Sequence, residues 1–489
     1  MNLFGTAGIR GGVEERVTPD LALAVGRAVA AEIRERGSAT DADRPEVVLA
    51  RDGRVTGAAL AAAIEAGLTA GGARVRRAGQ LPTPVLAYAS RGRYGVMLTA
   101  SHNPPTDNGI KLFRDGTEFA DGLEVAIERR VEADPDDAPW NAWTESTRVD
   151  VLGDYVETVV AYAGGFGAPL DQLRIAVDCG NGMAGPATPT VLRELGATVV
   201  TLNGNVDGHF PGRGSKPTPE SLRDLRAFIT DANEGVADPG RGGTGFAFGI
   251  GHDGDADRVV IVDADGEVVH EDTVLAILAE RYVRASDATD PVVVTTPNAS
   301  GRIDERVREA GGRVERVRLG ALHEGIAAVR ADAGDEPPTD VGGETTAEGP
   351  TGTDVVFAAE PWKHVHVPFG GWTDGVCSAA VIARLVADEG LDELREPVTE
   401  RPYRKRSVEC PDELKSSVMD RLEAALPKAF AEADVDTDHG VRLEFPDGSW
   451  TLVRPSGTEE YVRIYAESDD VDALVDDVRA VVKDATATV

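Results

Sequence analysis

Three aspartates occupy alternate positions between two apolar runs, as Asp253, Asp255 and Asp257. Hard divalent cations bind several carboxylate oxygens at once, and an Asp-x-Asp-x-Asp segment can wrap around one such ion. A calcium-binding EF-hand loop does not fit, because Arg258 stands where that loop needs glycine and Ala264 where it needs glutamate. The pattern therefore indicates a metal loop of another kind, with a solvated acidic turn as the structural alternative.

A serine and a histidine follow another apolar run, as Ser101 and His102. Residues 96–98 predict the end of a buried strand, because they are apolar and precede a break in the pattern. Residues 103–105, Asn-Pro-Pro, cannot continue a strand, and residues 107–109, Asp-Asn-Gly, predict a turn. A strand that ends in such a rigid loop can present the Ser101 hydroxyl to a ligand, although a lone Ser-His pair is common in ordinary polar loops.

Two further segments carry groups that suit a ligand. Near the C-terminus, residues 454–458 read Arg-Pro-Ser-Gly-Thr and interrupt a strand pattern. This loop offers an arginine, two hydroxyls and a run of backbone N–H groups, which together suit a phosphate dianion. Near the N-terminus, residues 4–12 hold four glycines around Arg10, and glycines allow the backbone to approach a ligand closely.

These segments are positioned by short strands. Each strand is followed by a polar or glycine-containing turn and then by a helix. Residues 47–54, 174–182 and 292–300 each begin in this way, which is the rhythm of α/β domains. The last hundred residues differ. They predict a strand at 405–410, a helix at 411–431, three strands at 440–445, 449–454 and 461–466, and a closing helix at 471–483. The fold class is therefore predicted as α/β, with three related α/β domains and a smaller C-terminal α+β domain. The predicted domains are 1–145, 146–267, 268–395 and 396–489.

The composition excludes several kinds of partner. A net charge of −34 at pH 7 repels nucleic acid and anionic membranes. The sequence has no stretch of about 18 apolar residues that would span a membrane, and no signal-peptide pattern is visible, so we expect a cytoplasmic protein. A monomer or a homodimer is expected. Seven lysines against 43 arginines, among 84 acidic residues, indicate adaptation to high salt, as in halophilic archaea. Three widely spaced cysteines do not form a disulfide pattern.

In this order, the serine loop, the metal loop and the C-terminal loop resemble those of the α-D-phosphohexomutase superfamily. This superfamily includes phosphoglucomutases, phosphomannomutases and phosphoglucosamine mutases. Residues 81–84 and 207–213 are also similar to turns of that family. The resemblance covers nearly the whole chain and implies four domains around a central cleft. It further implies that Ser101 is carried as a phosphoserine.

The resemblance implies an enzyme that interconverts hexose 1-phosphate and hexose 6-phosphate, with glucose or mannose as the hexose. Phospho-Ser101 would donate its phosphoryl group to the free sugar hydroxyl. The resulting hexose 1,6-bisphosphate would reorient and return its other phosphate to Ser101. Such transfer depends on positioning and on charge neutralisation. Mg²⁺ would be the metal, bound by one phosphoserine oxygen and by Asp253, Asp255 and Asp257.

The resemblance also gives roles to single residues around these loops. Arg258 would neutralise charge at the phosphoserine, with assistance from Arg10 and Lys111. Either Lys111 or His102 would take the proton of the sugar hydroxyl. The phosphate that does not react would be held by residues of the fourth domain, namely Arg454, Ser456, Gly457, Thr458 and Arg463.

A glutamate would bind the sugar hydroxyls, and the sequence offers two candidates. Glu344 follows two glycines and matches the family's Gly-Gly-Glu more closely, but it lies in an acidic stretch without an apolar lead-in. Glu360 ends an apolar run, so a strand would hold its carboxylate in place at a lower entropic cost. We therefore predict Glu360 as the sugar ligand, with Lys363 and His364 beside it for the phosphate.

Two departures from the family pattern leave the identity of the sugar open. The last loop has Glu460 where the family usually has proline, and the usual Gly-Glu-x-Ser-Gly sugar loop is absent in that form. Phosphoglucosamine mutase is therefore an alternative within the family. A non-catalytic sugar-phosphate-binding protein and a phosphatase are alternatives outside the mutase activity, although the presence of Ser101 with all three aspartates favours a mutase.

Overall fold

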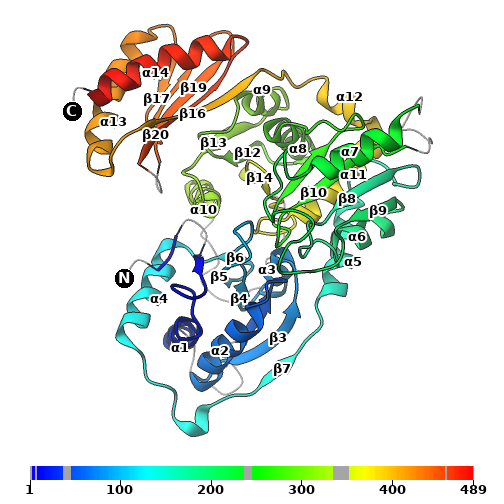
Figure 1. Cartoon of the computed structure of the whole chain (residues 1–489), viewed down its shortest axis with the longest axis vertical. Coiled ribbons are helices and arrows are strands. Elements are labelled where there is room, and N and C mark those ends of the chain that lie inside the picture. Colours follow the sequence, from blue (N-terminus) through cyan, green and yellow to red (C-terminus); the bar gives the residue numbers. More distant parts are fainter. Residues whose placement is uncertain are drawn as a thin grey trace.

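Four sheets, which follow one another along an arc, organise the chain (Figure 1). The computed structural model describes residues 3–5, 8–36, 46–235, 245–333, 352–456 and 460–487. The largest apolar core runs through the second and third sheets and reaches the first, which ties these three domains together. Among the described residues, no helix is both long enough and apolar enough to cross a membrane.

The first sheet has the strand order β1-β5-β4-β2-β3-β7, with β6 paired to β5. All five residues of β4 are buried, as expected of an apolar strand that is covered on both faces. Strand β7 extends this sheet past residue 145, where the sequence predicted the domain to end. The elements are β1 (Ile9–Gly12), α1 (Pro19–Arg36), β2 (Glu46–Arg51), α2 (Gly57–Ala70), β3 (Arg74–Gln80), α3 (Thr83–Ala89), β4 (Tyr94–Leu98), β5 (Asp107–Arg114), β6 (Thr117–Glu118), α4 (Asp121–Ala133), the 3-10 helix η2 (Trp140–Ala142) and β7 (Ser146–Arg148).

The second sheet has the order β11-β10-β8-β9, in which β11 is antiparallel to β10 and the other pairs are parallel. Strand β10 is buried along its whole length, with helix α7 packed against it. The elements are α5 (Leu152–Ala163), β8 (Arg174–Asp178), α6 (Thr188–Glu194), β9 (Thr198–Leu202), α7 (Arg223–Asn233), β10 (Phe248–His252) and β11 (Val259–Val262).

The third sheet has the order β13-β12-β14-β15, again with an antiparallel last strand. Helix α11 packs against α5 and α6 of the second domain, which joins the two domains. The elements are α8 (Glu271–Ala285), β12 (Asp290–Thr295), α9 (Gly301–Glu309), β13 (Arg313–Arg316), α10 (Leu322–Asp332), β14 (Thr353–Glu360), β15 (Lys363–Val365), α11 (Gly375–Glu389) and α12 (Leu391–Arg395).

The first three sheets share one topology once β1, β6 and β7 are set aside. Numbered along the chain within each domain, the strands lie in the order second, first, third, fourth, and only the fourth is antiparallel. The three expected α/β domains are therefore related in structure. In each domain the turn between the third and fourth strands is a predicted site loop. These turns are residues 99–106, 253–258 and 361–362.

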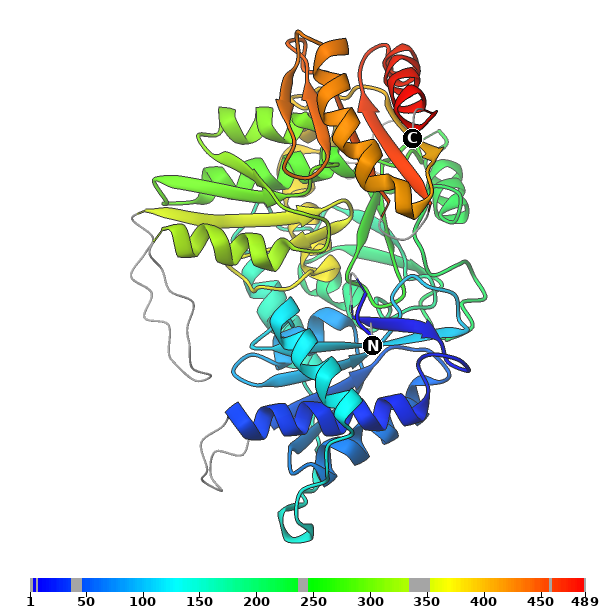
Figure 2. The same cartoon turned by 90° about the vertical axis from the view of Figure 1, so that its left-hand side faces the viewer.

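The fourth sheet is antiparallel, with the order β16-β20-β19-β18-β17, and α13 and α14 pack against it (Figure 2). A buried ion pair of 2.8 Å between Arg302 on α9 and Glu467 on β20 attaches it to the third domain. The sequence did not predict β17. The elements are β16 (Tyr403–Glu409), η3 (Asp412–Leu414), α13 (Lys415–Ala429), β17 (Asp434–Asp436), β18 (Val441–Glu444), β19 (Trp450–Pro455), β20 (Tyr461–Glu467) and α14 (Val471–Ala487).

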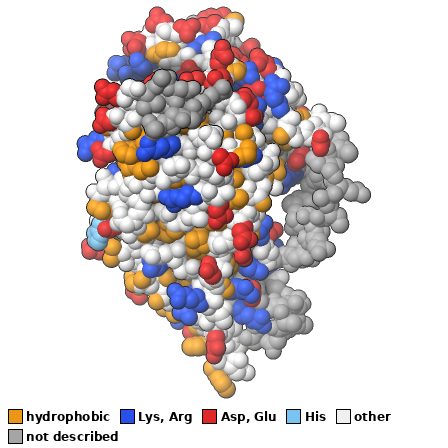
Figure 3. All heavy atoms as spheres, turned by 90° about the vertical axis from the view of Figure 1, so that its right-hand side faces the viewer, with side chains coloured by type: hydrophobic (Ala, Val, Ile, Leu, Met, Phe, Trp, Pro, Cys, Tyr) orange, Lys and Arg blue, Asp and Glu red, His pale blue; other side chains and the backbone are white. Residues whose placement is uncertain are grey.

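We expect molar KCl to raise the melting temperature of the protein. Acidic side chains are interspersed with basic ones on the face shown in Figure 3, but a net charge of −34 leaves an excess of self-repulsion. At molar ionic strength the Debye length falls to about 3 Å, so this repulsion is screened. Thermal melts across a KCl series measure the effect, with NaCl at equal ionic strength as the control. A melting temperature that stays constant in both salts would contradict the prediction.

Candidate active site

The serine loop between β4 and β5 meets the metal loop between β10 and β11. Ser101 is buried, and its Oγ donates a hydrogen bond of 2.7 Å to Oδ2 of Asp253. Its Oγ also lies 3.4 Å from Nδ1 of His102. The two loops are in close contact, since a Cβ added to Gly254 would lie 2.5 Å from the Ser101 carbonyl oxygen. The first and second domains thus build one site.

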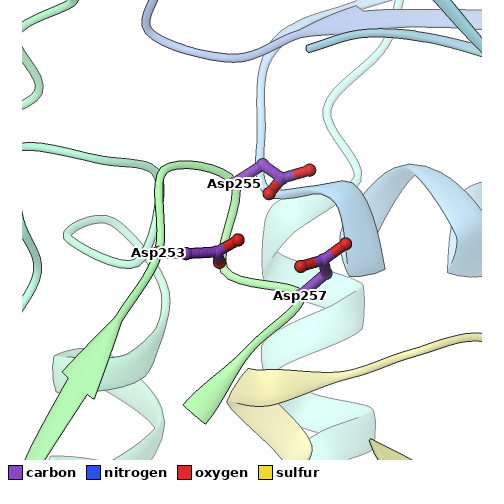
Figure 4. A group of neighbouring side chains, drawn as sticks. All are labelled: Asp253, Asp255 and Asp257. Carbon is purple, nitrogen blue, oxygen red and sulfur yellow. The ribbon is translucent and has the colours of Figure 1, made fainter. Parts of the chain in front are cut away.

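The three aspartates of the metal loop point toward a common centre (Figure 4). All three are buried, and one carboxylate oxygen of each lies within 4.8 Å of the others. Oδ1 of Asp255 and Oδ1 of Asp257 have no hydrogen-bond partner among the described residues. Buried carboxylate oxygens normally have partners, and a hard cation takes several such oxygens as ligands. The donor set therefore fits a hard divalent cation.

The three carboxylates of this site repel one another, and nearby basic side chains offset part of this repulsion. Burial raises the pKa of Asp253 well above its usual value, and the neighbouring carboxylates of Asp257 and Asp255 raise it further. For Asp257, burial acts in the same direction, but Lys111, Lys363 and Arg258 hold its pKa well below the usual value. A cation bound among the three carboxylates would relieve their mutual repulsion.

Lys111 on β5 is buried among carboxylates. Its Nζ lies 3.1 Å from Oδ2 of Asp257, 3.3 Å from Oε1 of Glu118 and 3.9 Å from Oδ2 of Asp255. Burial lowers its pKa, but these three carboxylates outweigh burial and keep the pKa above the usual value. Lys111 is therefore a fixed positive charge, which suits neutralisation of a phosphoryl group better than removal of a proton.

Two arginines and an uncharged histidine lie in the neighbourhood of Ser101. Nε of Arg258 lies 3.7 Å from Asp253 and 3.7 Å from Asp257. Arg10 on β1 lies opposite Gly109 of β5, next to the serine loop. Burial and the charges of Arg258 and Arg10 lower the pKa of His102 to about 2. The structure thus brings together all the residues predicted for the reacting phosphate.

The predicted phosphate loop follows β19 in the fourth domain. Arg454 lies directly opposite Arg463 on β20, so both side chains are on one face of the sheet, and Nη2 of Arg454 donates to the Tyr465 hydroxyl at 3.1 Å. The Ser456 hydroxyl is buried and finds no partner in the part of the chain that the structure describes. Two neighbouring guanidinium groups and such a hydroxyl suit a phosphate dianion. Gly457 and Thr458 lie outside the described residues.

Comparison with known proteins agrees with this arrangement. Family models for phosphoglucomutase/phosphomannomutase match in three places, with α/β/α domain I at residues 1–137, α/β/α domain II at 154–266 and the C-terminal domain at 408–485. The chain belongs to the phosphoglucomutase/phosphomannomutase family. Enzymes of this family are mutases, that is, isomerases that move a phosphoryl group. The resemblance of the motifs to the α-D-phosphohexomutase superfamily is thereby confirmed.

Relatives of this family align with nearly the whole chain. A probable phosphoglucosamine mutase from Methanopyrus kandleri is 40% identical, over 95% of this chain and 94% of its own length. A phosphopentomutase from Thermococcus kodakarensis is 37% identical, over 96% of this chain and 94% of its own. A crystal structure of a phosphoglucomutase/phosphomannomutase family protein from Burkholderia thailandensis has a TM-score of 0.79 and 26% identity, over 98% of this chain and 97% of that one.

The third predicted site loop of this mutase is the turn between β14 and β15. Glu360 pairs with Lys363 across this turn, and its Oε1 accepts a hydrogen bond from the backbone N–H of Gly320. The backbone N–H of Val259 donates to the Trp362 carbonyl at 3.1 Å, so the turn lies against the end of the metal loop. The structure therefore brings Glu360 and Lys363 to the site. The alternative sugar ligand, Glu344, lies outside the described residues.

His364 is buried and uncharged, so its predicted role as a positive group for the substrate phosphate is corrected here. The ring is buried, with Nδ1 3.0 Å from the Ser378 hydroxyl and its centroid 5.8 Å from that of Phe357. Burial lowers its pKa to about 3, so the ring is uncharged. His364 is an interior residue of the third domain.

Sequence reasoning missed several residues that hold the site together. Thr83, the first residue of α3, donates from Oγ1 to Oδ2 of Asp255 at 2.6 Å, and its backbone N–H donates to the Asp255 carbonyl at 3.0 Å. Glu118 is the partner of Lys111 described above. Arg54 lies beneath the serine loop. Thr83 and Arg54 lie in two segments of the sequence analysis, residues 81–84 and 47–54, but only their contacts in the structure reveal a role.

Proposed function

We propose that this mutase transfers a phosphoryl group between O1 and O6 of a hexose phosphate through phospho-Ser101, with Mg²⁺ bound by Asp253, Asp255 and Asp257. The observation that carries the proposal is the 2.7 Å contact between the Ser101 hydroxyl and a buried triad with two unpartnered carboxylate oxygens. When bound, Mg²⁺ would withdraw charge from the phosphoryl group. Hexose 1,6-bisphosphate is the intermediate of this reaction.

The residues of the chain supply positioning and charge for both halves of the reaction. The bond between Ser101 Oγ and phosphorus breaks while the sugar hydroxyl oxygen bonds to phosphorus. Lys111 and Arg258 neutralise the phosphoryl oxygens, with Arg10 beside them. Lys111 is held by three carboxylates, so we assign the hydroxyl proton to His102, whose ring lies 3.4 Å from Ser101 Oγ. The negative charge of a phosphoryl group on Ser101 would offset the nearby arginines and raise the pKa of His102 from its low value in the unphosphorylated site. Arg454, Ser456, Gly457, Thr458 and Arg463 would hold the distal phosphate.

The relatives change which sugar is the first candidate. The family resemblance implied glucose or mannose, with glucosamine as the alternative, and the relative from Methanopyrus kandleri is described as a probable phosphoglucosamine mutase. The carboxylate of Glu360 in the predicted sugar loop also suits an ammonium group. We therefore propose glucosamine phosphate as the preferred hexose phosphate.

A substrate panel tests this function. Purified protein in molar KCl is given the 1-phosphates of glucosamine, glucose, mannose and ribose, with Mg²⁺ and a trace of the matching bisphosphate, and the products are followed by ³¹P NMR. We expect the highest kcat/KM with glucosamine 1-phosphate. A higher value for another sugar would overturn the preference alone. Release of inorganic phosphate without isomerisation would indicate a phosphatase, and binding without turnover would indicate a non-catalytic protein.

Replacement of Glu360 with glutamine is expected to lower kcat/KM at least about tenfold. A charge-assisted hydrogen bond to a sugar hydroxyl contributes about 1.5–3 kcal/mol, and the amide of the introduced glutamine lacks the charge. Steady-state kinetics of Glu360→Gln measure the loss, and Glu344→Gln is the control because Glu344 is the rival sugar ligand. If Glu344→Gln is the impaired variant, the assignment of the sugar loop is wrong and the role of Lys363 is lost with it.

A further inference from the structure

Arg54 is completely buried beneath the serine loop, in the segment between β2 and α2. Its guanidinium group donates hydrogen bonds to four backbone carbonyls of that loop. The acceptors of Nη1 are Pro104 at 2.5 Å and Asp107 at 2.9 Å, and those of Nη2 are Ser101 at 2.9 Å and Asn103 at 2.8 Å. The side chain therefore holds the serine loop along most of its length.

Asp52 completes this arrangement. The Nε of Arg54 donates to Oδ2 of Asp52 at 3.0 Å, so that each of the five guanidinium N–H groups has an acceptor. The same Oδ2 accepts a hydrogen bond of 2.8 Å from the Thr99 hydroxyl, and that hydroxyl accepts one of 2.9 Å from the Ser101 backbone N–H. The N–H and the carbonyl of Ser101 are thus both tied, through Thr99 and Arg54, to one buried ion pair.

The second domain contains a similar pair. Arg213 is buried, donates from Nε to Asp178 at 2.9 Å, and donates from Nη2 at 2.6 Å to the carbonyl of His252, the residue before the metal loop. Asp178 ends β8 and Asp52 directly follows β2, and these are the first strands of two sheets with the same topology. In both halves of the site, an arginine that is fixed by an aspartate at an equivalent strand end thus binds backbone carbonyls in or directly before the site loop.

We propose that Arg54 is a positioning residue, which holds phospho-Ser101 in place against the metal loop; this rests on the proposed role of Ser101. The backbone of Ser101 is left-handed, with φ 52°, a conformation that a non-glycine residue keeps only when its surroundings enforce it. Phosphoryl transfer needs its groups in line, and a misplacement of about 1 Å can cost about 100-fold in rate. Lysine has the charge but not the planar fork of donors, so it cannot hold the same carbonyls.

Arg54→Lys is the variant that tests this role. We expect kcat to fall by about 100-fold, with KM within about threefold of wild type, because other residues bind the sugar and its distal phosphate. We also expect intact-mass time courses to show slower loading of phosphate onto Ser101 from the hexose 1,6-bisphosphate. The matched control is Arg384→Lys. Arg384 is also buried and donates to the carbonyls of Phe166, Gly164 and Gly167, away from the serine loop.

The control separates positioning from folding stability. Both lysine variants are expected to melt at a lower temperature, but only Arg54→Lys should lose kcat. The proposal is overturned if Arg54→Lys keeps kcat within threefold of wild type, if Arg384→Lys loses as much, or if the loss lies in KM alone. A wild-type protein without phosphoserine and turnover would instead overturn the proposed function, before any variant is compared.

Variants of Thr99 keep the test decisive if Arg54→Lys does not fold. Thr99→Val removes the hydroxyl that joins the Ser101 N–H to Asp52, whereas Thr99→Ser retains it. We expect at least a tenfold loss of kcat in Thr99→Val and near-normal kcat in Thr99→Ser. Equal kcat in these two variants would show that holding the Ser101 backbone does not affect the chemistry, which would overturn the proposal.

Discussion

Replacing Ser101 with alanine is expected to abolish turnover and to remove the phosphate carried by the protein. The Ser101 hydroxyl is the only group in our proposal that accepts and returns the phosphoryl group, so no other residue can substitute for it. We expect kcat to fall by roughly 10⁴-fold or more, as for removal of other nucleophiles. Intact-mass spectrometry of protein incubated with hexose 1,6-bisphosphate measures the adduct, and a coupled assay measures the rate.

Ser90→Ala is the matched control for this prediction. Ser90 is also buried in the first domain, but its hydroxyl donates to the Ala87 carbonyl and accepts from the Gly116 N–H rather than contacting the metal loop. This variant should keep both the adduct and the activity. A Ser101→Ala variant that is fully active, or that still gains a phosphate adduct, would end the assignment of Ser101.

Removal of Mg²⁺ is expected to abolish activity, and restoring Mg²⁺ after EDTA treatment should recover it. Asp255→Asn should reduce kcat by at least about 100-fold and should eliminate the rise in melting temperature that Mg²⁺ produces in the wild type. In EDTA, however, the same variant should melt at a higher temperature than the wild type. It removes one of three buried carboxylates that repel one another, and this repulsion contributes to the raised pKa of Asp253.

The control for the metal prediction is Asp272→Asn. Asp272 at the start of α8 is a buried carboxylate whose Oδ1 also has no partner among the described residues, but it lies outside the triad. The melting temperature of the Asp272→Asn variant should rise with Mg²⁺ as much as that of the wild type. Undiminished activity in excess EDTA, or a full Mg²⁺ response in Asp255→Asn, would contradict the metal site.

The sequence indicated the serine and metal loops because each is a short continuous segment. The alternation of Asp253, Asp255 and Asp257 and the break after residue 98 are visible without knowledge of the fold. The succession of strand, turn and helix likewise predicted the fold class. Contacts between distant segments could not be predicted in this way. Arg54 reaches the carbonyl of Ser101, and Thr83 reaches Asp255, only because strand ends meet at one edge of the structure.

Strand geometry explains why the predicted role of His364 was wrong. Lys363 and His364 were both expected to face the substrate, but β15 spans Lys363–Val365, and successive side chains of a strand point to opposite faces. Two neighbouring residues of one strand therefore cannot share a face. The sequence did not predict a strand as short as β15, so this constraint was not applied. The same geometry leaves Lys363 on the face where it acts on Asp257.

The first three sheets have a common topology, so the first three domains are three copies of one structural unit, and each copy has a different proposed role in the site. Each copy contributes the turn between its third and fourth strands. On the proposed roles, the first turn carries the nucleophile, the second carries the metal ligands, and the third directly follows the sugar ligand Glu360. Sugar preference can then diverge through replacements at residues 361–362 and their neighbours while the phosphoryl-transfer machinery stays intact. Such separation makes the scaffold readily evolvable, and it marks a single turn as the place to redesign substrate choice.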